Sequence, residues 1–125
     1  MRYLVLLKAH TVPNSPPPPE LMMAIAALGE EATTAGVLVD SQGLQPSSAG
    51  RRVSLSRGQL SAADGPFAEA KELISYAVYD VRSREDAVQW TTRFLQAHHD
   101  LWDGWEGEAD ILPTFGPTDF TSLES

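Results

Sequence analysis

Residues 74–81, ISYAVYDV, carry apolar side chains on both of the faces that alternate along a β-strand. One face holds Ile74, Tyr76 and Val78, and the other holds Ala77, Tyr79 and Val81. Because a strand that is apolar on both faces is typical of the interior of a sheet, this segment predicts a central strand buried on both sides. The segment RYLVLLKA, residues 2–9, has the same pattern and predicts a second central strand.

An amphipathic helix is predicted after each of these strands. The first spans about residues 19–35, with Pro19 at its first position and Gly36 as a left-handed stop. Its apolar stripe consists of Leu21, Ile25, Leu28 and Ala32. Ser83, which acidic residues follow, predicts the N-terminal cap of the second helix. The apolar stripe of this helix includes Ala87, Trp90, Phe94 and Leu101.

Three further segments predict strands. Residues 37–46, VLVDSQGLQP, predict a short strand that ends in a loop. Residues 51–65, RRVSLSRGQLSAADG, predict a β-hairpin at an edge, in which Val53 and Leu55 share one face and the other face is open to water. Residues 109–115, ADILPTF, predict a short closing strand.

The order of these elements predicts an α+β fold, a ferredoxin-like βαββαβ unit with an inserted β-hairpin. Right-handed crossovers would place both helices on one face of a largely antiparallel sheet. The chain length fits a single domain over residues 1–125, with a flexible Pro-rich loop at about 11–19 and a polar tail at about 116–125. A second copy is the simplest cover for the other face of the sheet, so we expect a homodimer, a dimeric α/β barrel.

Composition excludes several classes of function. Seventeen acidic residues against nine basic residues give a formal net charge of −8, and the basic residues are dispersed, which argues against nucleic acid as a partner. The chain has no cysteine, and we expect neither a metal ion nor a cofactor. The uninterrupted apolar run Tyr3 to Leu7 is too short for a membrane span or a signal-peptide core. These features predict a cytoplasmic protein without membrane contact.

Five separated segments, in order, make the chain similar to the YCII-related superfamily, specifically its DGPF branch. The segments are MRYLVLLKA, AGVLVDSQGLQPSSAGRRV, ADGPFAEAKELISYAVYDV, SREDAVQW and EGEADILPTFGPTDF. The most specific element consists of Asp64, Gly65, Pro66 and Phe67, followed by Glu69, Lys71 and Glu72. The resemblance implies a ferredoxin-like dimeric α/β barrel with a polar cluster in an active-site cleft. Some relatives resemble lyases or dehydrochlorinases, and members of the branch accompany extracytoplasmic-function sigma factors.

Two functions follow from this resemblance and stay open. In the first, a YCII-like protein binds a small polar or anionic metabolite in a dimer-associated cavity and removes a proton from it, or eliminates a leaving group, without a cofactor. In the second, the chain is a non-enzymatic regulatory module with a sigma-factor-linked protein partner. A third role, that of an oxygenase, rests on fold analogy alone.

Asp64 and His10 are the candidate catalytic residues. Asp64 is either a turn residue that accepts backbone N–H bonds or a general base with a pKa raised toward neutrality. His10 has a reference pKa of about 6.5, suited to proton transfer, although a surface loop is its simpler interpretation. Lys8 shares the strand face of His10 and is a candidate substrate ligand. Lys71 would pair with Asp64, orient an anionic substrate or remain in solvent.

The other candidate substrate ligands are Gln45, Phe67 and Tyr76. Gln45 stands where the DGPF branch often has a histidine, so it is a positioning group and not a base. Phe67 is either a core side chain or a platform for the substrate. Tyr76 and Tyr79 point to opposite faces of their strand, so one of them would reach the predicted dimer cavity, and Tyr76 is the preferred candidate; the alternative for either is a core side chain. Adjacent helical residues diverge by about 100°, so His98 and its neighbour do not predict a metal site. The segment with Trp102 and Trp105 would either pack over the dimer seam or form a docking surface for a protein partner, and packing is the preferred interpretation.

Overall fold

The computed structural model describes residues 1–67 and 71–116, so most of the predicted tail lies outside the described residues. In chain order the elements are β1 (Arg2–Thr11), α1 (Pro19–Thr34), β2 (Leu38–Gly43), the short 3-10 helix η1 (Ser47–Ala49), β3 (Arg51–Ser56), β4 (Gln59–Asp64), β5 (Glu72–Asp80), α2 (Arg84–Leu101) and β6 (Glu106–Pro113). Among these residues, no helix is both long enough and apolar enough to cross a membrane.

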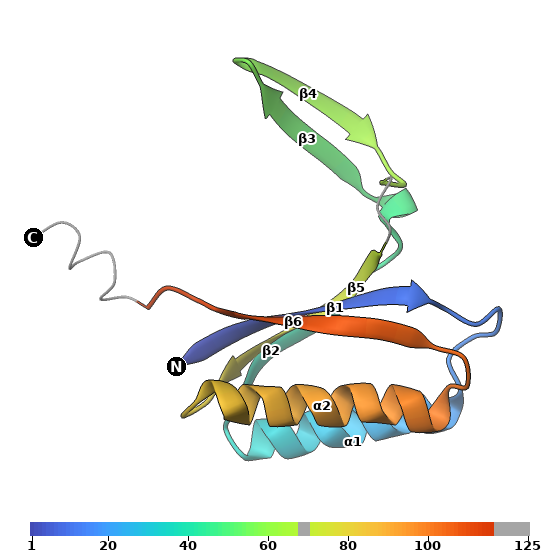
Figure 1. Cartoon of the computed structure of the whole chain (residues 1–125), viewed down its shortest axis with the longest axis vertical. Helices are drawn as coiled ribbons and strands as arrows, with labels where there is room; N and C mark the ends of the chain where they lie inside the picture. The colour runs from blue at the N-terminus through green and yellow to red at the C-terminus, as the bar shows by residue number, and fades with distance from the viewer. Residues whose placement is uncertain (68–70, 117–125) are drawn as a thin grey trace, which may run out of the picture.

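The main sheet has four strands in the order β2-β5-β1-β6, and every neighbouring pair is antiparallel. Both helices cover one face of this sheet (Figure 1). This order, with a helical connection in each half of the chain, is that of a ferredoxin-like α+β fold, as predicted. β1 and β5 occupy the two central positions, which confirms the prediction from their apolar patterns.

The two faces of β1 are buried to different extents. Tyr3, Val5, Leu7 and Ala9 point toward the helices and are at most 6% exposed. Leu4, Leu6 and Lys8 point to the opposite face, which we call the open face, and are only partly buried. The prediction that the central strands are buried on both sides is therefore correct for the helix side and wrong for the open face of the single chain.

A β-bulge in β5 changes one predicted orientation. Leu7 pairs with Ser75, but the next residue of β1, Lys8, pairs with Leu73, so Ile74 is the extra residue. Ile74 packs against the cluster of Leu7 and Leu21 under the helices. The prediction that Ile74 shares a face with Tyr76 is therefore wrong, because the bulge interrupts the strict alternation of the strand.

The ends of the helices follow their local sequence signals. Pro19 is the first residue of α1, and Gly36 follows the helix with a φ of 75°, a conformation that glycine adopts without a steric penalty. The hydroxyl of Ser83 caps α2 by accepting a hydrogen bond from the backbone N–H of Asp86 at 3.2 Å. These three predictions are confirmed.

The segment after α2 contributes to the core. Trp102 and Trp105 are each 8% exposed and belong to the same apolar cluster as Leu7, Ala9 and Leu21. The two indoles therefore pack, as preferred, but into the core of their own chain and not over a dimer seam. β6 begins at Glu106 and not at residue 109, because Glu106, Gly107 and Glu108 pair with residues at the end of β1.

The hairpin of β3 and β4 forms a separate two-stranded sheet. It projects away from the main sheet on the side opposite the helices (Figure 1). All of its strand residues are exposed, including Val53 (72%), Leu55 (70%) and Leu60 (75%). The prediction of a hairpin is confirmed, but the prediction that it is an edge feature with a single wet face is wrong, since neither face is covered in the single chain.

Candidate functional site

The Asp-Gly-Pro-Phe turn fixes the base of the hairpin against the loop around η1. The backbone N–H of Gly65 donates to the carbonyl oxygen of Gly50 at 2.9 Å, and that of Phe67 donates to the hydroxyl of Ser47 at 3.2 Å. A Cβ atom at position 65 would lie 1.7 Å from the backbone oxygen of Ser47. Only glycine allows this approach, so the turn sets the distance between the hairpin and the loop.

An open groove of about 920 Å³ lies at this junction, where the loop, the hairpin base and the ends of β1 and β5 meet. Its lining includes the predicted ligand-binding residues Lys8, Gln45, Phe67 and Lys71, together with Arg52 and Glu72. Sequence elements that are far apart in the chain therefore form one concave surface. We call this surface the polar groove.

Interactions within the polar groove orient its side chains. The guanidinium of Arg52 lies 4.3 Å from the ring centroid of Phe67, a cation–π geometry. Glu72 accepts hydrogen bonds from the backbone N–H of Ser47 at 2.5 Å and from its hydroxyl at 3.3 Å. Phe67 thus carries a cation on its face, and Glu72 is held against the loop.

A charged cluster lies beside the groove on the open face of the sheet. Glu108 of β6 binds Nζ of Lys71, and its Oε1 also lies 2.6 Å from Nε2 of His10. On the same face, Nζ of Lys8 lies 2.7 Å from a carboxylate oxygen of Asp110. The hydrogen bond from Lys71, followed by that from His10, lowers the pKa of Glu108, so this side chain is a carboxylate at neutral pH.

The predicted residues therefore divide into groups. Four line the groove, and His10 is linked to it through the Glu108 carboxylate that it shares with Lys71. Asp64 lies on the hairpin, where its side chain is 81% exposed and 3.0 Å from Nε of Arg51. The structure does not bring Asp64 together with Lys71 or His10. Its catalytic role stays a prediction.

Tyr76 lies on the open face, since it pairs with Leu6 of β1, whereas Tyr79 is buried beneath the helices. Its hydroxyl donates to Asp40 at 2.8 Å, and this bond raises the pKa of Tyr76. Tyr76 does not line the polar groove; beside the edge strand β2 it contributes instead to the lining of the cavity between the sheet and the helices. Its role in substrate binding also stays a prediction.

Sequence reasoning missed Glu108 and Arg52. The signal for Glu108 is the alternation in Glu106-Gly107-Glu108-Ala109-Asp110, which puts the acidic residues on one strand face. A strand predicted to begin at residue 109 excluded it. Arg52 gave no local signal, because its contact with Phe67 depends on the turn that folds the hairpin base back onto the loop.

The side chains of this site are of the types that recognise anions and transfer protons in proteins. Lysine and arginine side chains recognise carboxylates and phosphates, and a histidine held by a carboxylate is a typical general base. His10 and Glu108 have this arrangement, with the carboxylate positioned to stabilise an imidazolium. Within residues 1–67 and 71–116, no group of three His, Cys, Asp or Glu side chains is placed to hold a metal ion.

Comparison with protein-family models identifies the family of this chain. A family model of the YCII-related domain matches residues 1–103, which include His10, the groove residues and both helices. No curated protein matches the chain. Glu108 and Asp110 follow the matched segment and complete the charged cluster from β6. Because the family model covers most of the sequence and its span contains the groove, the chain belongs to the YCII-related family.

Proposed function

We propose that this YCII-related protein binds a small anionic metabolite, such as a carboxylate or a sugar phosphate, in the polar groove. The observation that carries the proposal is the convergence of Lys8, Lys71 and Arg52 in one groove with the amide of Gln45. Cations with a neighbouring amide are suited to an anion that also carries a hydroxyl or carbonyl group. The chain as a whole has a net charge of −8, so this local concentration of cations is needed to attract an anion.

The existing ion pairs do not prevent such binding. Lys8 pairs with Asp110 and Lys71 pairs with Glu108, and all four side chains are at least 32% exposed. Exposed ion pairs contribute at most about 1 kcal/mol each, so a ligand anion can replace the protein carboxylate at little cost. Salt should weaken the binding for the same reason.

The proposed chemistry is removal of a proton next to the bound carboxylate, followed by elimination. His10 takes the proton from carbon, the electron pair of the C–H bond forms the new double bond, and the leaving group departs as an anion. Glu108 stabilises the imidazolium that forms on His10, and Lys71, which binds Glu108 when no ligand is present, would turn to the carboxylate of the substrate. Asp64 is the competing candidate base, which a pH–rate profile of Asp64→Asn would test: an unchanged profile excludes it.

A homodimer is part of the proposal, because the open face carries partly exposed apolar side chains. Leu4, Leu6 and Val78 lie on this face beside Leu112, which is 47% exposed. A second copy would bury these side chains and close the groove against solvent. Light scattering at micromolar concentration should give the mass of a dimer, and a monomer would contradict this part of the proposal.

The exposed hairpin favours a second candidate function, that of a protein-interaction module. Val53, Leu55 and Leu60 form an apolar hairpin surface that is at least 70% exposed in the single chain. The sigma-factor association of the DGPF branch, which stays a prediction, would supply the partner. Binding of a purified extracytoplasmic-function sigma factor to wild type but not to Leu60→Asp would support this role.

Thermal melting tests the proposed function directly. Wild type, Lys71→Met and Arg52→Met would be melted with small carboxylates, halogenated acids and sugar phosphates. A ligand at ten times its dissociation constant raises the free energy of unfolding by about 1.4 kcal/mol. Arg84→Met, at an exposed position of α2, is the matched loss of one positive charge outside the groove. Stabilisation of wild type and Arg84→Met, but not of the groove variants, supports the proposal, and equal or absent stabilisation in all four proteins contradicts it.

A further inference from the structure

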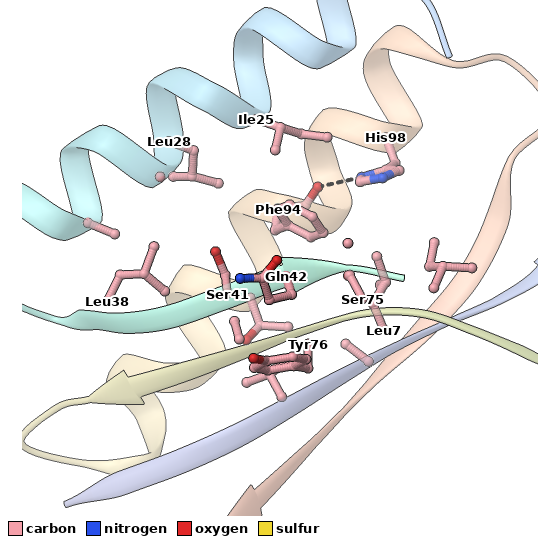
Figure 2. Close-up of a pocket in the computed structure, with 18 of the residues that line it drawn as sticks. Leu7, Ile25, Leu28, Leu38, Ser41, Gln42, Ser75, Tyr76, Phe94 and His98 are labelled. Carbon is pink, nitrogen blue, oxygen red and sulfur yellow. Dashed lines mark hydrogen bonds between the residues drawn. The ribbon is translucent and has the colours of Figure 1, made fainter. Parts of the chain in front are cut away.

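A second concave space lies on the other side of the sheet, between the sheet and the two helices. This inner cavity has a volume of about 570 Å³, within the usual range for a small-molecule site. Figure 2 shows side chains that surround it from the helices and the strands: Ile25, Leu28, Phe94, Leu38 and Leu7. Among the described residues, no Asp, Glu, Lys or Arg lines the inner cavity.

His98 of α2 is the titratable base in this lining. The residue is 4% exposed, and its Nδ1 lies 2.9 Å from the backbone carbonyl oxygen of Phe94 (Figure 2). A carbonyl oxygen can only accept, so Nδ1 carries the proton and Nε2 presents a lone pair. The imidazole packs against the rings of Phe94 and Trp105, at centroid distances of 4.9 and 4.5 Å.

The second ring nitrogen, Nε2, distinguishes His98 from an ordinary core histidine. Within residues 1–67 and 71–116, Nε2 has no hydrogen-bond partner. Burial lowers the pKa of His98, so the ring is neutral at pH 7 and Nε2 remains an acceptor. Although the residue as a whole is buried, Nε2 is not among the fully buried unpaired atoms of the described residues, which are the indole nitrogens of Trp102 and Trp105. Nε2 is therefore an accessible acceptor, and a donor group of a ligand in the cavity can hydrogen-bond to it in place of water.

The inner cavity also has a route to solvent. Met22 of α1 and Ser41, Gln42 and Leu44 of β2 and its following loop belong to the lining and are exposed. Because β2 is an edge strand of the sheet, these exposed lining residues form one side of an opening next to α1. A ligand can enter there without separating the helices from the central strands.

We propose that the inner cavity binds a neutral, largely apolar alcohol or phenol, whose hydroxyl group donates a hydrogen bond to Nε2 of His98. The apolar lining accepts the hydrocarbon part, and the neutral lining excludes carboxylates and amines, which would be buried without a counter-ion. The site is chemically opposite to the polar groove. The inference goes beyond the proposed function and does not depend on it.

Calorimetry with two matched probes tests the hydrogen bond. 2-Naphthol carries the donor, and 2-methoxynaphthalene has a similar shape without it. Wild type should bind 2-naphthol about fivefold more tightly, the ratio that corresponds to a net hydrogen bond of about 1 kcal/mol. His98→Phe keeps an aromatic ring and should bind both probes equally, whereas His99→Phe, at the exposed neighbouring position, should keep the preference.

A steric variant tests the position of the site independently. Ile25→Trp fills the cavity from α1 and should abolish binding of both probes, while Met23→Trp, at a position that is 72% exposed, should leave it unchanged. Far-ultraviolet circular dichroism and a cooperative melt would establish that each variant is folded. No binding to wild type, an equal preference in wild type and His98→Phe, or unchanged binding to folded Ile25→Trp would overturn the proposal.

Discussion

The two faces of the main sheet each have a histidine beside a concave site, but in opposite environments. On the open face, the side chain of His10 is 39% exposed and lies 2.6 Å from the carboxylate of Glu108. On the helix face, His98 is 4% exposed and its ring nitrogen binds a backbone carbonyl. The charged partner suits His10 to proton transfer, whereas the apolar surroundings of His98 suit it to accept a hydrogen bond from a neutral ligand.

This contrast arises from the alternation of side chains along β1. Leu7 enters the core beneath the helices, and the next residue, Lys8, reaches the polar groove. One strand therefore supplies both the packing that stabilises the fold and a side chain of the proposed site. Substitution of Leu7 should therefore lower the stability of the fold, whereas substitution of the adjacent Lys8 should act on the proposed binding site.

Leu7→Ala should have the largest effect on stability. Leu7 is 3% exposed, and loss of a fully buried leucine side chain costs about 2–5 kcal/mol of unfolding free energy. Leu6→Ala, on the open face, is the matched change and should cost about 1 kcal/mol in dilute protein, because its side chain is only partly buried. Urea denaturation measures both values. Equal losses of unfolding free energy in the two variants would mean that the two faces of β1 are buried to the same extent in the single chain.

The same two variants, Leu6→Ala and Leu7→Ala, also test the dimer when the protein concentration is varied. If a second copy covers the open face, the cost of Leu6→Ala should grow with concentration, while that of Leu7→Ala should not. A cost that is independent of concentration for both variants would argue against the dimer.

Gly65→Ala should have the next largest effect, since its Cβ would overlap the backbone oxygen of Ser47. Overpacking of this kind costs about 1–3 kcal/mol. Gly29→Ala is the control, because nothing lies within 4 Å of its added Cβ atom, and it should stabilise α1 by up to about 1 kcal/mol. Thermal melting distinguishes the two. A neutral Gly65→Ala would show that the turn does not fix the hairpin base as described.

The burial of His98 should make the stability of the protein depend on pH. Burial lowers the pKa of His98, so the unfolded chain binds its proton more readily than the folded chain does. The contribution of neutral His98 is fully present above the unfolded pKa of about 6.5 and is lost as pH falls toward the lowered folded value. The titratable groups that share its cavity, Tyr76 and Tyr79, stay neutral in this range, since their pKa values are raised.

Urea denaturation at several pH values measures this contribution. Wild type should lose more stability than His98→Phe as the solution is acidified below pH 6.5, because protonation of His98 favours the unfolded chain. Identical pH profiles for the two proteins would show that His98 is not desolvated in the folded state.

The smallest expected effect is a change in the pKa of Glu108, the acidic residue at the centre of the charged cluster on the open face. Lys71→Met should raise the pKa of Glu108 toward its usual range, because the hydrogen bond from Lys71 is the main cause of its lowered value. His10→Asn should raise this pKa less. Carbon-detected NMR titration of the side-chain carboxyl would measure the change. If the pKa of Glu108 were unchanged in Lys71→Met, Lys71 would not be a hydrogen-bond partner of Glu108 in solution.

Local signals explain how much of the fold could be predicted. Pro19, Gly36 and Ser83 specify the helix ends through their own backbone and side-chain chemistry, and the alternating apolar residues specify the strands. The bulge at Ile74 has no such signal, because it depends on the register between β1 and β5. The exposure of both hairpin faces likewise depends on the tertiary position of the hairpin.

The sequence is enough to predict which residues line the candidate site, but not which charged residues form ion pairs there. Lys8, Gln45, Phe67 and Lys71 were identified as candidates and line one groove. The partner of Lys71 is Glu108 and not Asp64, because β6 pairs with β1 across the sheet while the turn directs Asp64 onto the hairpin. Contacts between strands that are distant in sequence decide which charges meet.

The sheet is proposed to separate two sites of opposite chemistry, and NMR of one labelled sample can follow both sites in the same experiment. Backbone amide shifts would be followed during titration with phosphoglycolate, which carries a carboxylate and a phosphate, and then with 2-naphthol. We expect saturable shifts at Gln45, Ser47 and Phe67 for the anion, and at residues around His98 and Ile25 for the naphthol. Gly43 and Leu44 line both sites and should respond to both probes. Overlap of the two sets beyond these residues, or shifts scattered over the surface with either probe, would contradict the separation of the two sites.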